Sequence, residues 1–345
     1  MNKKLSIFAI ILVIIGTIGT VWSGITTMPY LMDIALSAEK EINKEHTIYN
    51  EEINVNKLDI YTKSSNIIIK KHDKKNVIIN RKGKSSYVRY DINNNDSALF
   101  IKEIDRDIEK REKIKDLDGL INLGIENIFL NDIQSIVVYV PNDVDINVVT
   151  EGGDLKIEDD VFLDSLVFKT YAGRISLPEK IKDLDSLKII SKQQVYLSMA
   201  ELIGIKTVNI LSSSINIYSD DKDIFIDDIE KYIPEKVNID QSTNNGSNYG
   251  ININTDIPVA KDITINAYNS NVDLSLPIEK YKINFDIKSL EDIDLTGLIE
   301  KNIVNENDSR VYQDTREIKG ILNNQLINLE NEYKVNVKSE YINIY

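Results

Sequence analysis

The most constraining feature of the sequence is a recurring pair of apolar residues with a single residue between them. Apolar residues at every second position indicate short strands with one buried face. Two pairs with six residues between them occur at Leu58, Ile60, Ile67 and Ile69; Ile146, Val148, Leu155 and Ile157; Leu166, Phe168, Ile175 and Leu177; and Ile263, Ile265, Val272 and Leu274. Shorter versions, with four residues between the pairs, start at Val208 and Val335. We therefore predict an all-β fold.

The repeats also have a nearly constant period. Their starts at 146, 166, 187 and 208 are 20, 21 and 21 residues apart. A constant period with strand–turn–strand content is typical of a solenoid, in which each rung pairs with its neighbours. The alternative is an antiparallel sandwich, but the Asn-Gly and Asp-Gly turns that short hairpins favour are missing from these corners. We predict a single-stranded β-solenoid-like stack of rungs of about 20–21 residues each.

The corners between paired strands have a composition of their own. A hydroxyl residue follows the first strand of most rungs, namely Thr62, Thr150, Thr170, Ser191, Ser212 and Ser339. Turn formers come next, such as Gly152-Gly153 and Asn269-Ser270-Asn271. We expect positive φ angles at these glycines and asparagines, and hydroxyl caps on the turns.

Two segments break the repeat. Residues 103–134 hold a charge run in which Ile104, Ile108 and Ile114 have loosely helical spacing, so we expect a partly helical insertion. Residues 241–250 are a polar loop with no strand pattern, more typical of a tolerated insertion than of a binding site.

The amino-terminal segment predicts a membrane anchor. Residues 5–25 carry no charge, and 21 residues of helix span about 30 Å, the thickness of the hydrocarbon core. Lys3 and Lys4 precede this segment, so the positive-inside rule places residues 1–4 in the cytoplasm and residues 51–345 outside the cell, after a connector at 26–50. The alternatives are a buried core helix and a cleaved signal peptide, but the segment is long for a signal peptide and lacks a good cleavage site.

Composition excludes several classes of function. The formal net charge is −14, and a strongly acidic body repels phosphates, so we expect no nucleic-acid partner. The same charge argues against binding of other polyanions, unless basic residues cluster in the fold. The absence of cysteine removes disulfides, thiol catalysis and thiolate metal sites.

The sequence resembles an adhesin-like β-strand-repeat family of unknown function, found in membrane-anchored envelope proteins of Gram-positive bacteria. The resemblance is carried by VVYVPNDVDINVVTEGGDLKIED at 137–159, ITINAYNSNVDLSLP at 263–277 and YKVNVKSEYINIY at 333–345, and covers roughly residues 50–345. The chain departs from the family pattern at corner positions such as Ser65, Gln193 and Ser213, where glycine is common. The resemblance implies a β-solenoid-like domain near the envelope and no established catalytic residues.

No residue pattern supports a catalytic, cofactor or metal site. The only two histidines, His46 and His72, have no partner in the sequence that would make a catalytic pair, so we expect both to be solvated. The acidic clusters are Asp91 with Asp96, Glu158-Asp159-Asp160, Asp220-Asp221-x-Asp223 and Asp227-Asp228. An EF-hand starting at Asp91 would have Asp96 and Lys102 where glycine and glutamate are needed. Solvated turns are the expectation, with a loose Ca²⁺ site at 220–228 as the alternative.

These observations favour a non-catalytic, membrane-anchored protein that binds, senses or scaffolds at the cell envelope. Its expected partner is an envelope component or another protein. The alternatives are a polysaccharide-cleaving β-helix, which would need carboxylates on adjacent rungs, and a scaffold that assembles through the open ends of the stack.

The strand pattern predicts which side chains of one rung face inward. Ile175 and Leu177 should be buried, whereas Lys169 and Ser176 should be exposed. Ile175→Asp should therefore destabilise the protein strongly, because an unpaired carboxylate would lie among apolar side chains. Ser176→Asp should change the free energy of unfolding by no more than about 0.5 kcal/mol. Urea unfolding followed by circular dichroism measures both, and the reverse order of effects would show that the register is wrong.

Overall fold

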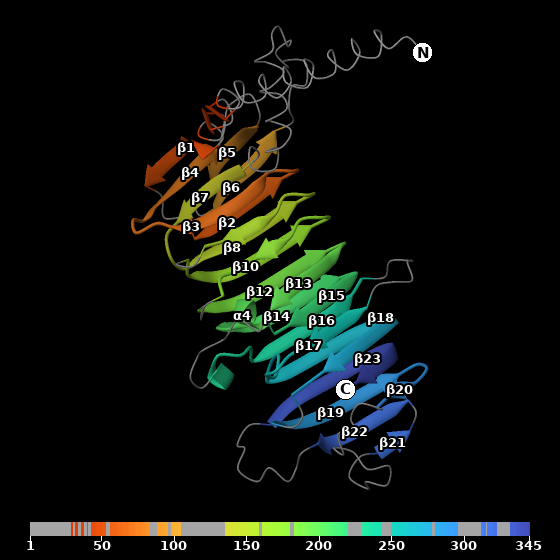
Figure 1. Cartoon of the computed structure of the whole chain (residues 1–345). Coiled ribbons are helices and arrows are strands. Elements are labelled where there is room, and N and C mark those ends of the chain that lie inside the picture. Colours follow the sequence, from red (N-terminus) through yellow and green to blue (C-terminus); the bar gives the residue numbers. More distant parts are fainter. Residues whose placement is uncertain are drawn as a thin grey trace, which may run out of the picture.

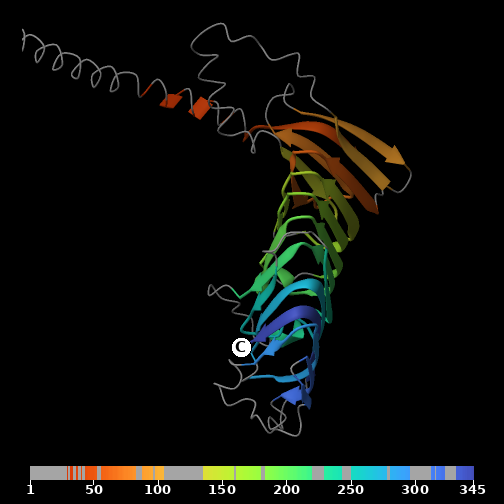
Figure 2. The same ribbon diagram turned by 90° about the vertical axis from the view of Figure 1, so that its right-hand side faces the viewer.

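The computed structural model describes residues 29, 32, 33, 36, 37, 40, 43–52, 56–82, 88–95, 98–104, 135–158, 161–179, 183–219, 229–242, 250–277, 280–295, 312–314, 316–322 and 332–345. Figure 1 shows an elongated stack of strands, and Figure 2 shows that two sheets form its two sides. The prediction of an all-β fold is confirmed. The predicted anchor at 5–25 lies outside the described residues. None of the helices that the structure describes has the length and apolar content to span a bilayer.

The first sheet is a row of parallel strands, each paired with the next in register. In spatial order these are β6 (Ala98–Ile104), β2 (Lys57–Thr62), β8 (Val144–Thr150), β10 (Leu163–Thr170), β12 (Leu184–Ser191), β14 (Ile205–Ser212), β16 (Lys236–Gln241), the first half of β18 (Asp262–Ser275), the first half of β23 (Glu332–Ile344) and β19 (Lys282–Ser289). The predicted rung starts Ile146, Leu166, Leu187 and Val208 are direct register partners. The 20–21-residue period therefore equals one circuit of the stack.

The second sheet contains the strands that follow each corner. Its amino-terminal part has the order β1 (Glu45–Glu52), β4 (Asn76–Lys82), β7 (Ser135–Val140), β3 (Asn66–Lys71), β9 (Leu155–Ile157) and β11 (Ile175–Ser176). Its carboxyl-terminal part consists of β13 (Gln194–Ser198), β15 (Ser214–Tyr218), β17 (Ile251–Asn254), the second halves of β18 and β23, and β20 (Ile293–Asp294). A short helix, α4 (Met199–Leu202), begins with a capping box between Ser198 and Glu201. The Glu201 carboxylate also accepts a 3.0 Å hydrogen bond from the backbone of Leu177, which links the two parts.

The interior contains the predicted apolar pairs. Ile175 and Leu177 are buried while Lys169 and Ser176 are exposed, so the predicted register of that rung is confirmed. The same alternation runs along the other rungs, and their inward side chains form one continuous core.

The corner hydroxyls form a column beside the core. The hydroxyls of Thr150, Thr170 and Ser191 accept hydrogen bonds of 2.8, 2.6 and 3.1 Å from the backbone of Gly153, Gly173 and Gln193. Further along the stack, Ser212 donates to the carbonyl of Gln193 in the neighbouring rung. The expected hydroxyl caps are thus confirmed at Thr150, Thr170 and Ser191, since a buried corner amide must find a partner within the protein. At Thr62 the expectation was wrong, because its buried hydroxyl has no hydrogen-bond partner in the described structure.

The corner glycines are required for a reason other than the predicted one. Positive φ angles in the described part of the chain occur only at Asp143, Gly204 and Gly320, so the expectation of positive φ at the corners was wrong. A Cβ on Gly153 would instead lie 2.0 Å from the carbonyl oxygen of Ser65, and one on Gly173 would lie 2.0 Å from that of Gly153. Stacked corners approach each other too closely for a side chain at these positions.

The chain order of the rungs differs from their spatial order at both ends. The β6–β7 rung follows β2–β3 in sequence but stacks outside it, so β2–β3 directly contacts β8–β9. The last strand, β23, lies between β18 and the earlier pair β19 and β20. The repeat period did not indicate either of these two departures from the chain order.

Antiparallel strands cover both ends of the stack. β4 and β1 pair outside β7, β5 (Arg89–Asn95) pairs with β6, and β22 (Glu317–Leu322) and β21 (Tyr312–Asp314) pair outside β19. The Glu103 carboxylate accepts hydrogen bonds of 2.8, 3.3 and 3.1 Å from the backbone of Lys63, Ser64 and Ser65. Glu103 at the end of β6 is thus the partner of three successive corner amides between β2 and β3. In the described structure the outermost strands are therefore β1, β5 and β21 rather than the parallel strands of the rungs, and assembly through the ends stays a prediction.

Two predicted boundaries need correction. β1 begins at Glu45 and pairs with β4, so the β-stack includes the last residues of the predicted 26–50 connector. The described residues between 29 and 43 are helical. β6 continues to Ile104, so the break in the repeat starts after that residue rather than at 103. Residues 105–134, which contain most of the expected helical insertion, lie outside the described residues.

The two neighbouring glycines of one corner give a matched test of this packing. Gly153→Ala should destabilise the protein by about 1–3 kcal/mol or more, because the new methyl group collides with the backbone of Ser65. Gly152→Ala should have little effect, because a Cβ there lies 3.9 Å from the nearest atom, the carbonyl oxygen of Lys63. Urea unfolding of the two variants measures the difference. Equal effects would mean that the corners do not stack this closely.

Candidate functional site

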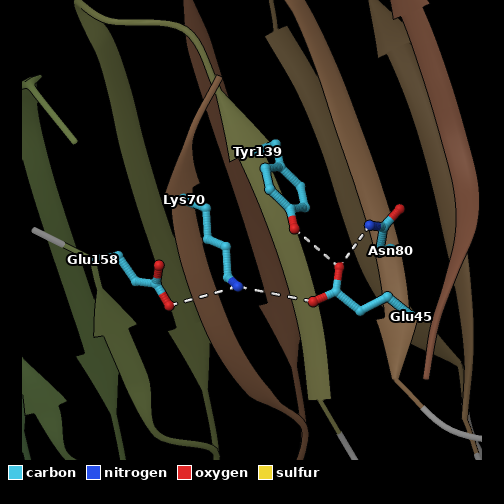
Figure 3. Close-up of polar contacts among 5 residues, drawn as sticks. All are labelled: Glu45, Lys70, Asn80, Tyr139 and Glu158. Atoms are coloured by element: carbon cyan, nitrogen blue, oxygen red, sulfur yellow. Dashed lines mark hydrogen bonds and ion pairs between the residues drawn. The ribbon is translucent and has the colours of Figure 1, made fainter. Parts of the chain in front are cut away.

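The most connected polar cluster crosses the outer side of the second sheet at its amino-terminal end. Five adjacent strands each contribute one side chain: Glu45 from β1, Asn80 from β4, Tyr139 from β7, Lys70 from β3 and Glu158 from the end of β9 (Figure 3). We call this set the Glu45 network. Its residues come from segments up to 113 positions apart, so no local pattern in the sequence points to it.

Strand parity explains why these side chains meet. Lys70 is the register partner of Tyr139, and the residues of the preceding register pair, Ile69 and Val138, are both buried. Because successive side chains of a strand point to opposite faces, Lys70 and Tyr139 both lie on the outer face.

Glu45 and Lys70 make most of the contacts within the network. One oxygen of Glu45 accepts hydrogen bonds from Tyr139 Oη at 3.1 Å and from Asn80 Nδ2 at 2.8 Å. Lys70 Nζ lies 3.8 Å from the other oxygen of Glu45 and 3.6 Å from Glu158, with its ammonium 5.8 Å from the centre of the Tyr139 ring. The network therefore ties β1, the first strand of the stack, to strands deeper in the sheet.

The electrostatics fit a structural role. Burial raises the pKa of Tyr139, and the charge of Glu45, its hydrogen bond and the charge of Glu158 raise it further. The phenol therefore stays protonated and donates to Glu45. Both carboxylates face the Lys70 ammonium, which lies between them.

The two histidines are less solvated than predicted. His46 lies on β1 opposite Arg81 and is half-buried. His72 is also half-buried, with its ring edge-to-face against Tyr139 at a centroid distance of 6.4 Å. Its Nε2 is buried and has no hydrogen-bond partner in the described structure. The charged residues around His72 in the sequence hid this packing.

The predicted acidic clusters are not brought together into a site. Asp91 is exposed on β5 and accepts a 3.1 Å hydrogen bond from Asn93. Glu158 belongs to the Glu45 network, whereas Asp96, Asp159, Asp160 and residues 220–228 lie outside the described residues. The part of the chain that the structure describes contains no group of His, Cys, Asp or Glu side chains suited to a metal ion.

An acidic edge that we did not predict borders the first sheet. Because the strands are parallel, their starting residues lie along one edge, and those of β8, β10 and β12 carry Asp143, Asp145, Asp164, Asp183 and Asp185. Burial raises the pKa of Asp164, and the charges of the other four aspartates raise it further, so all four lie close enough to act on Asp164. The spacing of these aspartates ahead of each rung start could have revealed this edge.

The outward amides and carboxylates pair between rungs. Asn147 donates to Asp59 at 2.8 Å, Asn238 to Asn209 at 2.8 Å and Asn266 to Asp240 at 2.9 Å. These outward side chains thus hold neighbouring rungs together. Exposed tyrosines, including Tyr61, Tyr171 and Tyr196, stand among them.

The interior offers little room for a ligand. One cavity of about 10 Å³ lies between β17, β18, β19 and β23, and one of about 20 Å³ lies near Leu163, Leu177 and Asp183. Each volume corresponds to about one water molecule. Any ligand of these parts of the stack would have to bind at the surface.

The Glu45 network can be tested through its tyrosine. Tyr139→Phe should lower the free energy of unfolding by about 1–2 kcal/mol, because a hydrogen bond to a carboxylate is lost. The pKa of Tyr139 is raised in the folded protein. The contribution of the Tyr139 hydroxyl to the free energy of unfolding is therefore complete below about pH 10, the ordinary tyrosine value, and is lost as the pH rises through the folded pKa. Urea unfolding at pH 8 to 11 should therefore show a smaller alkaline loss of stability in Tyr139→Phe.

Tyr196→Phe is the matched control. Its hydroxyl donates to Gln194 at 2.7 Å, but the residue is 52% exposed, so the change should cost no more than about 0.5 kcal/mol. Equal losses in the two variants would contradict a special role for the Glu45 network.

Comparison with known proteins places the chain in a family. A structure named "putative adhesin" from Bacteroides fragilis is 12% identical, with 88% of this chain and 97% of that chain covered and a TM-score of 0.36. A "putative cell adhesion protein" from Clostridium sporogenes is 11% identical, with 87% and 99% covered and a TM-score of 0.18. At these scores neither structure bears on what this chain binds. A search of curated proteins gives no significant match. The Toastrack DUF4097 profile matches residues 55–313, which is more than half of the chain, so the chain belongs to the Toastrack DUF4097 family.

Proposed function

We propose that the chain is a membrane-anchored, non-catalytic protein of the cell envelope, whose β-stack serves as a binding or scaffolding surface outside the membrane. Residues 5–25 are the anchor and residues 1–4 remain in the cytoplasm. The family assignment is consistent with this proposal, and the uncharged amino-terminal segment motivates the location.

The observation that carries the non-catalytic assignment is the contrast between interior and surface. The core is filled by apolar side chains, and its two cavities hold about one water each. The outer faces, by contrast, carry amide and carboxylate side chains that hydrogen-bond between neighbouring rungs, together with exposed tyrosines. Such a molecule presents extended surfaces rather than an enclosed site for a small substrate.

The Glu45 network supports an anchored stack. β1 directly follows the segment that would connect the domain to the membrane, and it pairs with β4 along its length. The hydrogen bonds and ion pairs of Glu45 hold the start of β1 to β4, β7 and β3. The network would keep β1 paired when the connector is pulled or displaced.

Polysaccharide cleavage is less well supported. It needs a carboxylic acid and a carboxylate placed on either side of a bound sugar. Glu45 and Glu158 both face Lys70, and the aspartates of the acidic edge lie at exposed strand starts rather than in a cleft.

Protease accessibility tests the proposed topology. In intact bacterial protoplasts, added protease should remove most of residues 45–345 and leave a small membrane-bound fragment that carries an amino-terminal tag. Protoplasts lysed with detergent are the control, in which the tag should also become accessible. Full protection of the β-stack in intact protoplasts would overturn the proposed orientation. Release of the stack without protease would show that the anchor is cleaved.

A further inference from the structure

Across the three strands β8, β10 and β12, the outer surface of the first sheet has two edges of opposite charge, whereas the neighbouring strands β2 and β14 carry Lys57 and Lys206 at their starts. The strands β8, β10 and β12 start at the acidic edge described above. Their carboxyl ends and the corners that follow carry Lys169 and Lys192, with Lys63 at the equivalent position after β2. We call this surface the divided face. It shows that basic residues do cluster in a protein of net charge −14, which the sequence had not revealed.

Four charged side chains of the divided face, two acidic and two basic, form no ion pair within the described structure. In the described structure, Asp164 and Asp183 form no ion pair, and neither does Lys169. Lys192 contacts only the ring of Tyr171, at 5.7 Å. Asp185 does pair with Lys206, and Glu151 is an acidic residue on the basic edge. Two aspartates without an ion pair thus stand opposite two lysines without an ion pair on the same pair of strands.

Apolar side chains occupy the middle of the divided face. Val149, Val167 and Ile190 are half-buried on the outer side, and Leu211 on β14 is 38% exposed. Tyr61 and Tyr171, 41% and 60% exposed, extend the apolar surface toward the basic edge. Lys188 and Asn147 interrupt it. An apolar band between charged borders is typical of a protein–protein interface.

We propose that the divided face binds the divided face of a second copy of this chain. The two copies would pack face to face about a two-fold axis that runs parallel to the stack. This operation exchanges the two edges, so each acidic edge faces the partner's basic edge and the apolar bands meet in the middle. A two-fold axis parallel to the strands would instead place acid against acid. Charge segregation therefore selects one of the two symmetric arrangements.

The area is sufficient for such a dimer. Seven strands from β6 to β16, about 4.8 Å apart and about seven residues long at 3.3 Å each, give a flat area of roughly 750 Å². A standard interface buries about 800 Å² on each partner.

The selected axis leaves both copies pointing in the same direction along the stack. The amino-terminal ends would therefore lie side by side, as two copies anchored in one membrane require. The interface itself does not depend on the proposed anchoring. It also differs from assembly through the ends of the stack, because it uses the outer surface of the first sheet.

Cross-linking through one introduced cysteine tests the pairing in the full-length protein in membranes, since the chain has no cysteine of its own. Val167 lies between the two edges and hence near the proposed axis, so Val167→Cys should give a dimer with a short bis-maleimide. Asn252→Cys, on the opposite sheet and more exposed, is the control and should give little dimer. Equal yields at the two positions would indicate random collision and overturn the proposal.

Reversing the charge of one edge is the strongest test of the pairing, and every variant in it also carries Val167→Cys for cross-linking. Lys169→Glu with Lys192→Glu should lower the dimer yield at least about tenfold, because like charges then face each other, and Asp164→Lys with Asp183→Lys should do the same. The two charge variants co-expressed with different tags should cross-link to each other at near the original yield, which also shows that both are folded. Failure of this mixed pair to recover would overturn the proposal.

A different occupant would give a different pattern. If the basic edge bound an anionic polymer instead, Val167→Cys would give no dimer, and only the lysine substitutions would reduce retention of the protein on phosphate-bearing envelope polymers. That result would replace the second copy with a polyanion as the partner.

Discussion

The structure depends on one interaction, the parallel in-register pairing of each rung with the next. The pairing continues around the corners, where the backbone amides of Glu151 and Gly152 donate to the carbonyls of Thr62 and Lys63, and those of Tyr171 and Ala172 to Thr150 and Glu151. Because each rung repeats this pattern, identical positions stack into columns. The apolar core, the hydroxyl column, the hydrogen bonds between outward amides and the glycine contacts are all consequences of that register.

Columns also explain how the surface acquires its properties. One aspartate or lysine at the end of a strand is unremarkable, but repetition at neighbouring rungs places like charges side by side about 4.8 Å apart. The acidic edge arises in this way, and the pKa of Asp164 rises accordingly. A repeat fold thus concentrates charge that is spread along the sequence, so net charge alone is a poor guide to its surfaces.

The candidate sites were less predictable than the fold. Period-2 alternation was enough to predict the buried positions of the rung that contains Ile175, because strand parity is a local property. The Glu45 network was not predictable, since it joins β1, β4, β7, β3 and β9 only after β6–β7 has stacked outside β2–β3. His72 was misjudged for the same reason: its lysine neighbours are local, whereas Tyr139 reaches it through sheet pairing.

The repeating strands, the period of the rungs and the side of each strand that faces the core follow from the spacing of apolar residues along the chain. The order of the end rungs and the strands outside them depend instead on contacts between distant segments. Any two rungs of this kind can pair through their backbones, so the period does not specify which one is a neighbour. The corner glycines show the same division: their positions are visible in the sequence, but the contact that requires them, Ser65 with Gly153 and Gly153 with Gly173, exists only between stacked rungs.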